Sequence, residues 1–151
     1  MDAKQLSDYV TYVFNEQLPF NRFLGFEASW VAEDKVELRL PWKDELMGNP
    51  HQRILHGGVT AAILDTIGGL VSILQAVKEL APMEPDEFAG RLAKMGTIDM
   101  RVDYLRPGRG KLFIATAEVL RKGNKVAVCR MELHNQDNEH IALGTGTYLV
   151  G

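Results

Sequence analysis

Two groups that could carry chemistry stand near each other in the sequence, the tripeptide His56-Gly57-Gly58 and the carboxylate of Asp65. Asp65 is the only residue charged at neutral pH between Val59 and Val77, in the most apolar segment of the chain. A carboxylate in apolar surroundings is costly unless it is paired or hydrogen-bonded. Asp65 therefore has either a structural partner in a neighbouring loop or a chemical task, and the sequence leaves both open.

The tripeptide suits the recognition of a negatively charged oxygen. Two glycines at the start of a helix leave backbone N–H groups sterically open, with the positive end of the helix behind them. Such a site can hold an oxyanion or polarise a carbonyl oxygen. The alternative is that Gly57 and Gly58 only form a tight turn before the helix.

The spacing of the two groups limits how they can cooperate. If both lie on one helix, the rise of about 1.5 Å per residue separates His56 from Asp65 by more than about 10 Å. They cannot act on one atom from a single helix, so a reacting group would have to lie between elements. A symmetric dimer would bring Asp65 of one copy near Gly57 of the other.

The segment that carries Asp65 reads as a helix with apolar residues on all sides, which must be wrapped by other structure. Gly68 and Gly69 allow a close approach to its backbone, for which a second copy of the chain is one candidate. Residues 1–18 read as an amphipathic helix closed by Pro19, and residues 20–26 as an irregular aromatic-rich link. A loop spans residues 43–53, and a short helix with a C-cap at Gly96 spans residues 86–94.

The remaining segments alternate apolar and polar residues with the period of two that is typical of strands with one wet face. Gly123-Asn124 is a hairpin signal, and residues 135–139 form a polar turn. The predicted strands are two within residues 27–40 and one each at 97–104, 111–121, 125–134 and 141–150. This order predicts a single α+β domain over residues 1–151, with five or six antiparallel strands curled around one central helix.

Composition narrows the class of partner. The chain has 151 residues, a net charge of −3 and a pI near 5.8, which give no bulk attraction to nucleic acid and direct the search to small molecules. The single cysteine, Cys129, rules out an intrachain disulfide and a CxxC metal site, and we expect a cytoplasmic protein without a secretory signal. As a membrane span, the segment 59–77 would place Asp65 near its centre at roughly 2.5–3.5 kcal/mol, so we expect a buried helix instead.

Two stretches together resemble a known enzyme family. Residues 54–66, with the His-Gly-Gly step and Asp65, and residues 96–107, with the Arg-Pro step after an alternating strand, resemble the hotdog-fold thioesterase superfamily of the PaaI type. Residues 95–110, 123–128 and 145–148 extend the similarity to the YigI branch of acyl-CoA thioesterases.

The resemblance implies a hotdog fold and the hydrolysis of medium- to long-chain acyl-CoA without a metal or another cofactor. It also implies active sites between the subunits of a homodimer, possibly within a dimer of dimers. In such a site the N–H of Gly57 would polarise the thioester carbonyl. Asp65 of the opposite subunit would act as general base or nucleophile.

The resemblance carries further roles over to this chain. His56 and Asn49 would orient the leaving group or its loop, and Thr97 would help to hold water. Asn49 precedes His56 by seven positions where related enzymes often have six, and Thr97 stands where some relatives carry serine. Contacts with the substrate are expected from Gly58, Thr66, Arg106 and Arg109.

Some alternatives remain open. Arg106 and Arg109 lie in a compact basic loop that could seat the phosphates of CoA or could simply be solvated. His134 and His140 flank a polar turn without a carboxylate cluster, so we expect surface histidines and no metal. The competing functions are a hotdog enoyl-thioester hydratase or dehydratase and a non-catalytic acyl-CoA-binding module, which would leave Asp65 without a task.

Overall fold

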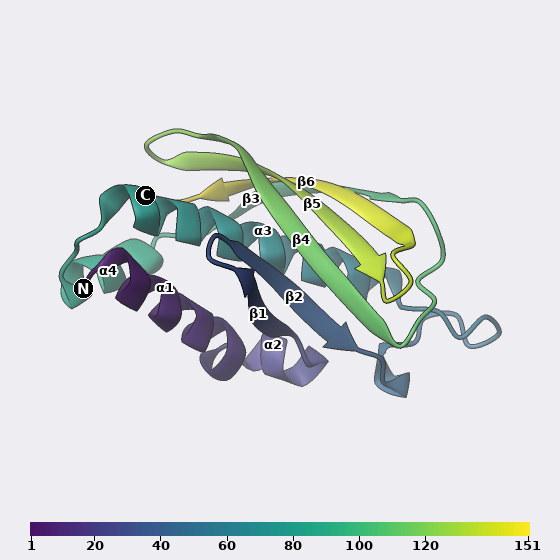
Figure 1. Ribbon diagram of the computed structural model, residues 1–151. Coiled ribbons are helices and arrows are strands. Elements are labelled where there is room, and N and C mark those ends of the chain that lie inside the picture. The colour runs from purple at the N-terminus through teal and green to yellow at the C-terminus, as the bar shows by residue number, and fades with distance from the viewer.

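The computed structural model describes all 151 residues and consists of one curled sheet around a long helix (Figure 1). The helices are α1 (Ala3–Tyr12), α2 (Pro19–Leu24), α3 (Gly57–Leu80) and α4 (Pro85–Leu92), with a π-helical turn at Val13–Gln17 and a 3-10 turn at Asp44–Leu46. The strands are β1 (Glu27–Ala32), β2 (Lys35–Pro41), β3 (Gly96–Tyr104), β4 (Leu112–Lys122), β5 (Val126–Asn135) and β6 (His140–Leu149).

All six strands are antiparallel and lie in the order β1-β2-β4-β5-β6-β3. The predicted α+β hotdog architecture is therefore confirmed. In β5 every second residue is buried toward α3, whereas the residues between them face outward, which is the alternation that the sequence shows. The predicted hairpin at Gly123-Asn124 joins β4 to β5.

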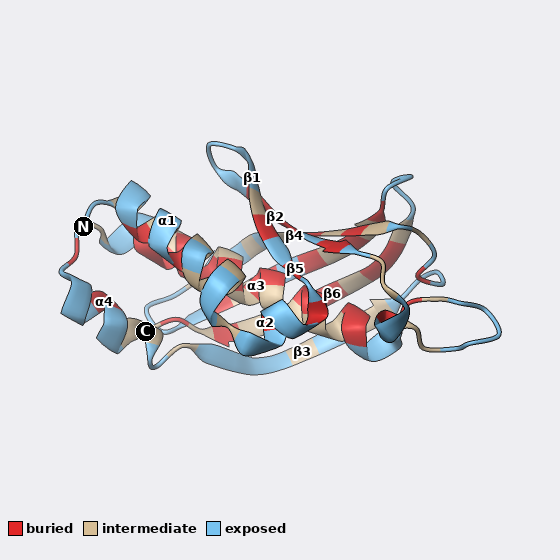
Figure 2. Cartoon of the chain, turned by 90° about the horizontal axis from the view of Figure 1, so that it is seen from below, coloured by how far each residue is buried: buried red, intermediate tan, exposed pale blue.

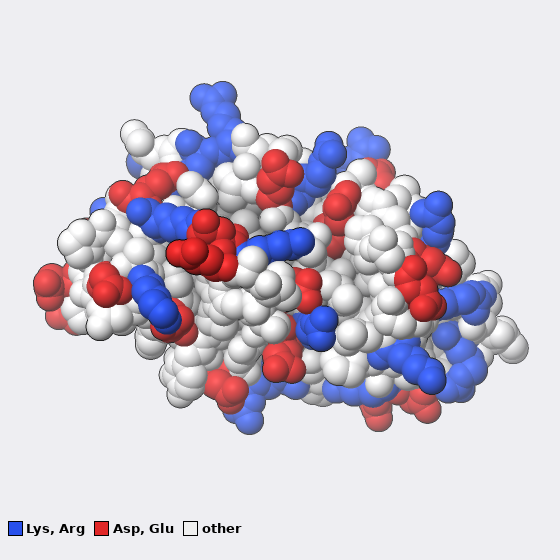
Figure 3. Space-filling model, in the orientation of Figure 1, with Lys and Arg blue, Asp and Glu red and all other residues white.

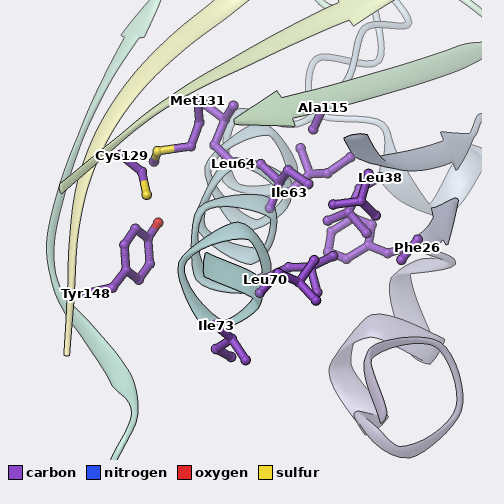
Figure 4. Close-up of a cluster of buried hydrophobic side chains, with 14 of the residues drawn as sticks. Phe26, Leu38, Ile63, Leu64, Leu70, Ile73, Ala115, Cys129, Met131 and Tyr148 are labelled. Atoms are coloured by element: carbon purple, nitrogen blue, oxygen red, sulfur yellow. The ribbon is translucent and has the colours of Figure 1, made fainter. Parts of the chain in front are cut away.

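Helix α3 occupies the concave side of the sheet, with α1 packed against it (Figures 1 and 2). Twelve of its 24 residues are buried, including Ile63, Leu64, Ile67 and Leu70, which have no exposed surface. Figure 4 shows three of these side chains among Phe26, Leu38, Met131 and others contributed by the surrounding elements. By length and composition α3 could cross a membrane, but here the sheet and α1 cover much of it, as the sequence predicts.

The close approach predicted at Gly68 and Gly69 is made by a side chain of the same chain. The ring of Tyr148, from β6, lies alongside α3 (Figure 4). A Cβ atom on Gly68 would overlap this ring, whereas a Cβ on Gly69 would lie 3.8 Å from it, at ordinary contact distance. The suggestion that a second copy approaches here is wrong for Gly68, because Tyr148 already fills the space.

The N-terminal segment differs from prediction in one respect. The amphipathic helix is present, begins with an Asp2–Gln5 capping box, and buries Leu6 and Val10. The link expected to be irregular is instead the short helix α2. Pro19 starts it, and Gly25 ends it in the left-handed conformation (φ 92°), so the usual start and stop signals were both present.

Two further boundaries are corrected. Helix α4 ends at Leu92 with Ala93 as its C-cap, and Gly96 begins β3 instead of capping the helix. The loop predicted at residues 43–53 contains the 3-10 turn and is closed by a bridge between Met47 and Leu55.

Strand β3 is an edge strand with little cover. It pairs with β6 on one side only, and most of its residues are exposed on both faces. Ile98, within it, is 55% exposed, and Leu105, which follows it, is 47% exposed. An exposed edge with apolar side chains is a surface on which another strand can pair.

Candidate active site

The start of α3 is shaped by His56, which is the N-cap residue. The Nδ1 atom of His56 accepts a hydrogen bond from the N–H of Gly58 at 2.8 Å. The neutral ring then carries its proton on Nε2, which leaves that atom as a donor. A Cβ on Gly58 would lie 2.9 Å from His56 Nδ1, so this cap requires glycine at position 58.

This arrangement gives the two glycines different roles. The N–H of Gly58 already donates to His56 Nδ1. The predicted contact between this N–H and the substrate is therefore not available. The N–H of Gly57 donates to no group in the chain. The Tyr104 hydroxyl donates to the Gly57 carbonyl oxygen at 2.6 Å and ties the first turn of α3 to the end of β3. Gly57 is therefore an exposed donor at the positive end of a helix, as oxyanion binding requires.

Two loops hold this turn through close backbone contacts. A Cβ on Gly48 would lie 2.9 Å from His56 Cα, and one on Gly108 would lie 2.6 Å from Leu55 Cβ. The N–H of His56 donates to Leu46 O at 2.8 Å, and that of Leu55 donates to Gly108 O at 2.9 Å. The sequence did not reveal this role of Gly48 and Gly108, because their close contacts with His56 and Leu55 form only when the chain folds.

Asp65 lies two turns further along α3 and is half-buried, so the apolar shielding expected from the sequence is partial. Thr97, at the start of β3, donates its hydroxyl proton to Asp65 Oδ1 at 2.8 Å. Asp65 Oδ2 accepts from no group in the chain and is the free atom of the carboxylate. Thr97 therefore orients Asp65, and its own lone pairs remain as acceptors for water.

Tyr148 supports the same turn and was not predicted as part of the site. Its hydroxyl donates to the backbone oxygen of Asp65 at 3.2 Å. Burial of the ring and the negative charge of Asp65 both raise the pKa of Tyr148 well above its usual value. The phenol thus stays protonated and keeps donating to α3.

The two groups face separate cavities. Asp65 and Thr97 line one of about 330 Å³, whereas Gly57 and Tyr104 line another of about 360 Å³ at the other end of β3. Thr66 lines the Asp65 cavity, and its hydroxyl donates to Ala62 O at 2.7 Å. The prediction that a single copy cannot bring Gly57 and Asp65 to one atom agrees with this geometry.

The remaining predicted residues lie around the Gly57 end. Asn49 is exposed, and its Oδ1 accepts from the N–H of His51 at 3.0 Å, so it shapes its own loop. Arg106 donates to His140 O at 2.9 Å, and Arg109 donates to Gln52 O at 2.8 Å.

Both guanidinium groups keep exposed surface, and they reach toward different neighbours. Figure 3 shows Lys and Arg side chains gathered at the right-hand end of the molecule, where Figure 1 places the 47–55 loop. The rings of His134 and His140 are half-buried and stack 4.5 Å apart, and the His140 carbonyl oxygen is the one that accepts from Arg106.

Comparison with known proteins identifies the family. The model of the thioesterase superfamily matches residues 52–142. The medium/long-chain acyl-CoA thioesterase YigI of Escherichia coli K12 is 46% identical over 151 residues, covering 100% of this chain and 97% of the relative.

Solved structures agree with that match. A protein of Shewanella oneidensis related to the thioesterase superfamily has a TM-score of 0.94 and 50% identity, covering 99% of this chain and 97% of its own. A protein of Syntrophus aciditrophicus has a TM-score of 0.83 and 34% identity, and the match covers 98% of this chain and 97% of that protein. The chain belongs to the thioesterase superfamily.

Proposed function

We propose that this protein hydrolyses medium- to long-chain acyl-CoA to the free fatty acid and CoA. The observation that carries the proposal is the pair of complementary groups on α3, the unpaired N–H of Gly57 and the free Oδ2 of Asp65. The acyl-chain class is supported by the 46% identical relative, which is named for medium/long-chain acyl-CoA.

The chemistry assigned to these groups follows from the reaction. Attack of water on a thioester carbonyl builds negative charge on the oxygen, which a backbone N–H at a helix start stabilises. Asp65 takes the proton of the attacking water, or attacks the carbonyl carbon itself, through Oδ2. In either route the C–S bond breaks and CoA leaves as a thiolate, a good leaving group because thiols have a pKa of about 8.5. In the second route the acyl group stays on Asp65 as a mixed anhydride, which water then hydrolyses to the free acid and the Asp65 carboxylate. No metal is needed for any of these steps.

The site is proposed to be shared by two subunits. Thr97 at the start of β3 binds Asp65, and Tyr104 at the end of β3 binds Gly57. If the free edge of β3 pairs antiparallel with the same strand of a second copy, the start of one strand lies opposite the end of the other. We call Asp65 with Thr97 the Asp65 half-site, and Gly57 with Tyr104 the Gly57 half-site. The Asp65 half-site of one subunit then meets the Gly57 half-site of its partner.

Roles for the flanking residues complete the proposal. His56 fixes the conformation of the oxyanion donor through its cap on Gly58, and Asn49 shapes the loop beside it. Arg106 and Arg109, at the same end of the molecule, are proposed to bind the phosphates of CoA.

The activity itself is tested by following free thiol released from acetyl-, hexanoyl-, decanoyl- and hexadecanoyl-CoA. We expect release to be faster with the medium and long chains than with acetyl-CoA. Stabilisation of the protein by acyl-CoA without thiol release would instead indicate a binding module. Loss of the enoyl absorbance of an enoyl-CoA without thiol release would indicate a hydratase.

The shared site is tested with two inactive variants in one dimer. Asp65→Asn removes the base, and Gly57→Pro removes the N–H at a helix position where proline is well tolerated. The preceding residue, His56, has φ −59° and ψ 133°, which suits a residue before proline.

A heterodimer of the two chains, isolated through two affinity tags, would contain one intact site of two. It should therefore recover about half of the wild-type activity. A heterodimer as inactive as its parents, or a protein that stays monomeric, would contradict the shared site.

A further inference from the structure

We propose that the cavity beside Asp65 receives the acyl chain and belongs to the same subunit as the Asp65 that acts on the thioester. We further propose that Gly69 and the N-terminal segment set the length of chain that fits. This inference rests on the proposed function, and it assigns the acyl pocket and the CoA site to different subunits.

The cavity wall suits an apolar ligand. Asp65 is the only charged residue that lines the cavity of about 330 Å³. Every lining hydroxyl donates within the chain: those of Thr66 and Ser72 to α3 carbonyl oxygens, that of Thr97 to the Asp65 carboxylate, and that of Tyr148 to the Asp65 carbonyl. A ligand beyond Asp65 therefore finds no hydroxyl donor, and an alkyl chain gains by leaving water.

The dimensions suit a chain of medium length. One wall is a stripe of α3 that runs from Asp65 past Gly69 to Ile73. At about 1.5 Å per residue this stripe is about 12 Å long. With C–C bonds of about 1.5 Å in a zigzag, that length holds roughly nine or ten carbons. A thioester held at Asp65 would thus have its chain along α3.

The opposite wall is built by the N-terminal segment, which lies outside the residues matched by the family model. Phe14 and Leu18, from the π-helical turn and the residue after it, line the cavity. The turn is fixed by Asn15, whose side chain makes two hydrogen bonds to the backbone of Ala28 (3.1 and 2.7 Å). Asn21, only 3% exposed, donates to Phe14 O at 3.1 Å. These clamps make the wall a fixed boundary.

Gly69 is the position from which the cavity can be filled without disturbing the fold. Its ideal Cβ meets only the Tyr148 ring, at 3.8 Å, so further side-chain atoms would extend into the cavity. Gly68 does not offer this choice, because any Cβ there overlaps Tyr148. Gly90, on α4, has open space around its Cβ and does not line the cavity, and it serves as a matched helical control.

The first experiment measures kcat/KM for the acyl-CoA series with three variants. Gly69→Leu should lower kcat/KM for decanoyl- and hexadecanoyl-CoA by about tenfold or more, as expected when a pocket loses room for methylenes, and leave acetyl-CoA little changed. Met95→Ala, which removes side-chain atoms from the wall, should raise the relative rate of hexadecanoyl-CoA. Gly90→Leu should match the wild type. Equal loss at all lengths, or no change, with Gly69→Leu would overturn the proposal.

The second experiment assigns the pocket to a subunit in the heterodimer described above. Its one live site uses Asp65 from the Gly57→Pro chain. Gly69→Leu added to that chain should impair hydrolysis of long chains, whereas the same change on the Asp65→Asn chain should not. The opposite result would place the pocket in the subunit that supplies Gly57. If the wild-type protein releases no thiol from any acyl-CoA, the proposed function itself fails, which is a different outcome from either of these.

Discussion

The two half-sites on α3 achieve their geometry in different ways. At the helix start the working group is a backbone N–H, exposed to solvent and held by loops that touch through Gly48 and Gly108. Two turns further along α3 the working group is a half-buried side chain, held by the Thr97 hydroxyl of β3, while the Tyr148 hydroxyl of β6 holds the backbone oxygen of the same residue. The Gly57 half-site therefore depends on the path of the backbone, whereas the Asp65 half-site depends on hydrogen bonds made by side chains.

This difference predicts how each half-site responds to mutation. A backbone donor survives a change of side chain as long as the path of the chain is kept, and it is lost only when the N–H itself is removed. A carboxylate held by a hydroxyl can be replaced by an isosteric amide. The amide keeps the hydrogen bond and the position of the side chain, but it cannot act as a base or nucleophile. The variants below separate the two cases.

The largest effect is expected for Asp65→Asn. The amide oxygen can still accept from Thr97, so the fold and the oligomeric state should be unchanged, while the loss of a proton acceptor lowers kcat by roughly 10³-fold. Thiol release and size-exclusion chromatography measure the two properties. Asp86→Asn, on the surface of α4, is the control. Turnover close to wild type in Asp65→Asn would remove Asp65 from the mechanism.

At the other half-site, Gly57→Pro should lower kcat by about 10²–10³-fold, the usual effect of removing one oxyanion donor. Gly57→Ala keeps the N–H, and its Cβ would lie 3.5 Å from the Tyr104 ring, an ordinary contact. The alanine variant should therefore retain most of its activity. If proline and alanine at position 57 behave alike, the backbone N–H is not the group that stabilises the oxyanion.

The comparison also explains what the sequence could and could not predict. The curled sheet, the wrapped helix and the separation of Gly57 from Asp65 follow from local periodicity and helix geometry, which are written in consecutive residues. The short helix α2 was missed although Pro19 and Gly25 mark its ends, because a segment of six residues is too short to show a clear helical period.

The supports of the site could not be predicted because they join residues distant in sequence. Tyr104 meets Gly57, Tyr148 meets Asp65, and Gly108 meets Leu55 only once the sheet has closed around α3. Whether the N–H of Gly58 is free depends on the side-chain rotamer of His56. Such facts are properties of the folded chain, and periodicity does not encode them.

A smaller effect should separate orientation from chemistry at the Asp65 half-site. Thr97→Val keeps the shape of the side chain but removes the hydroxyl that holds Asp65 Oδ1. The loss of one hydrogen bond to a charged group, worth about 1.5–3 kcal/mol, should lower kcat by roughly 10- to 100-fold. Thr97→Ser should restore most of the activity. Equal rates for valine and threonine would mean that Asp65 is oriented by other contacts.

The smallest effect is expected at the exposed basic loop beside Gly57. Arg109 reaches Gln52 O at 2.8 Å and keeps an exposed guanidinium at the end of the molecule where Gly57 lies. Arg109→Ala removes one solvent-exposed charge contact to a CoA phosphate, so it should raise KM a few-fold with little change in kcat. High salt should reduce the difference in KM between this variant and the wild type. Arg121→Ala, an exposed arginine near the end of β4, is the control for loss of surface charge. An unchanged KM in Arg109→Ala would show that CoA is held elsewhere, and a fall in kcat would show that Arg109 acts instead through the loop that positions Gly57.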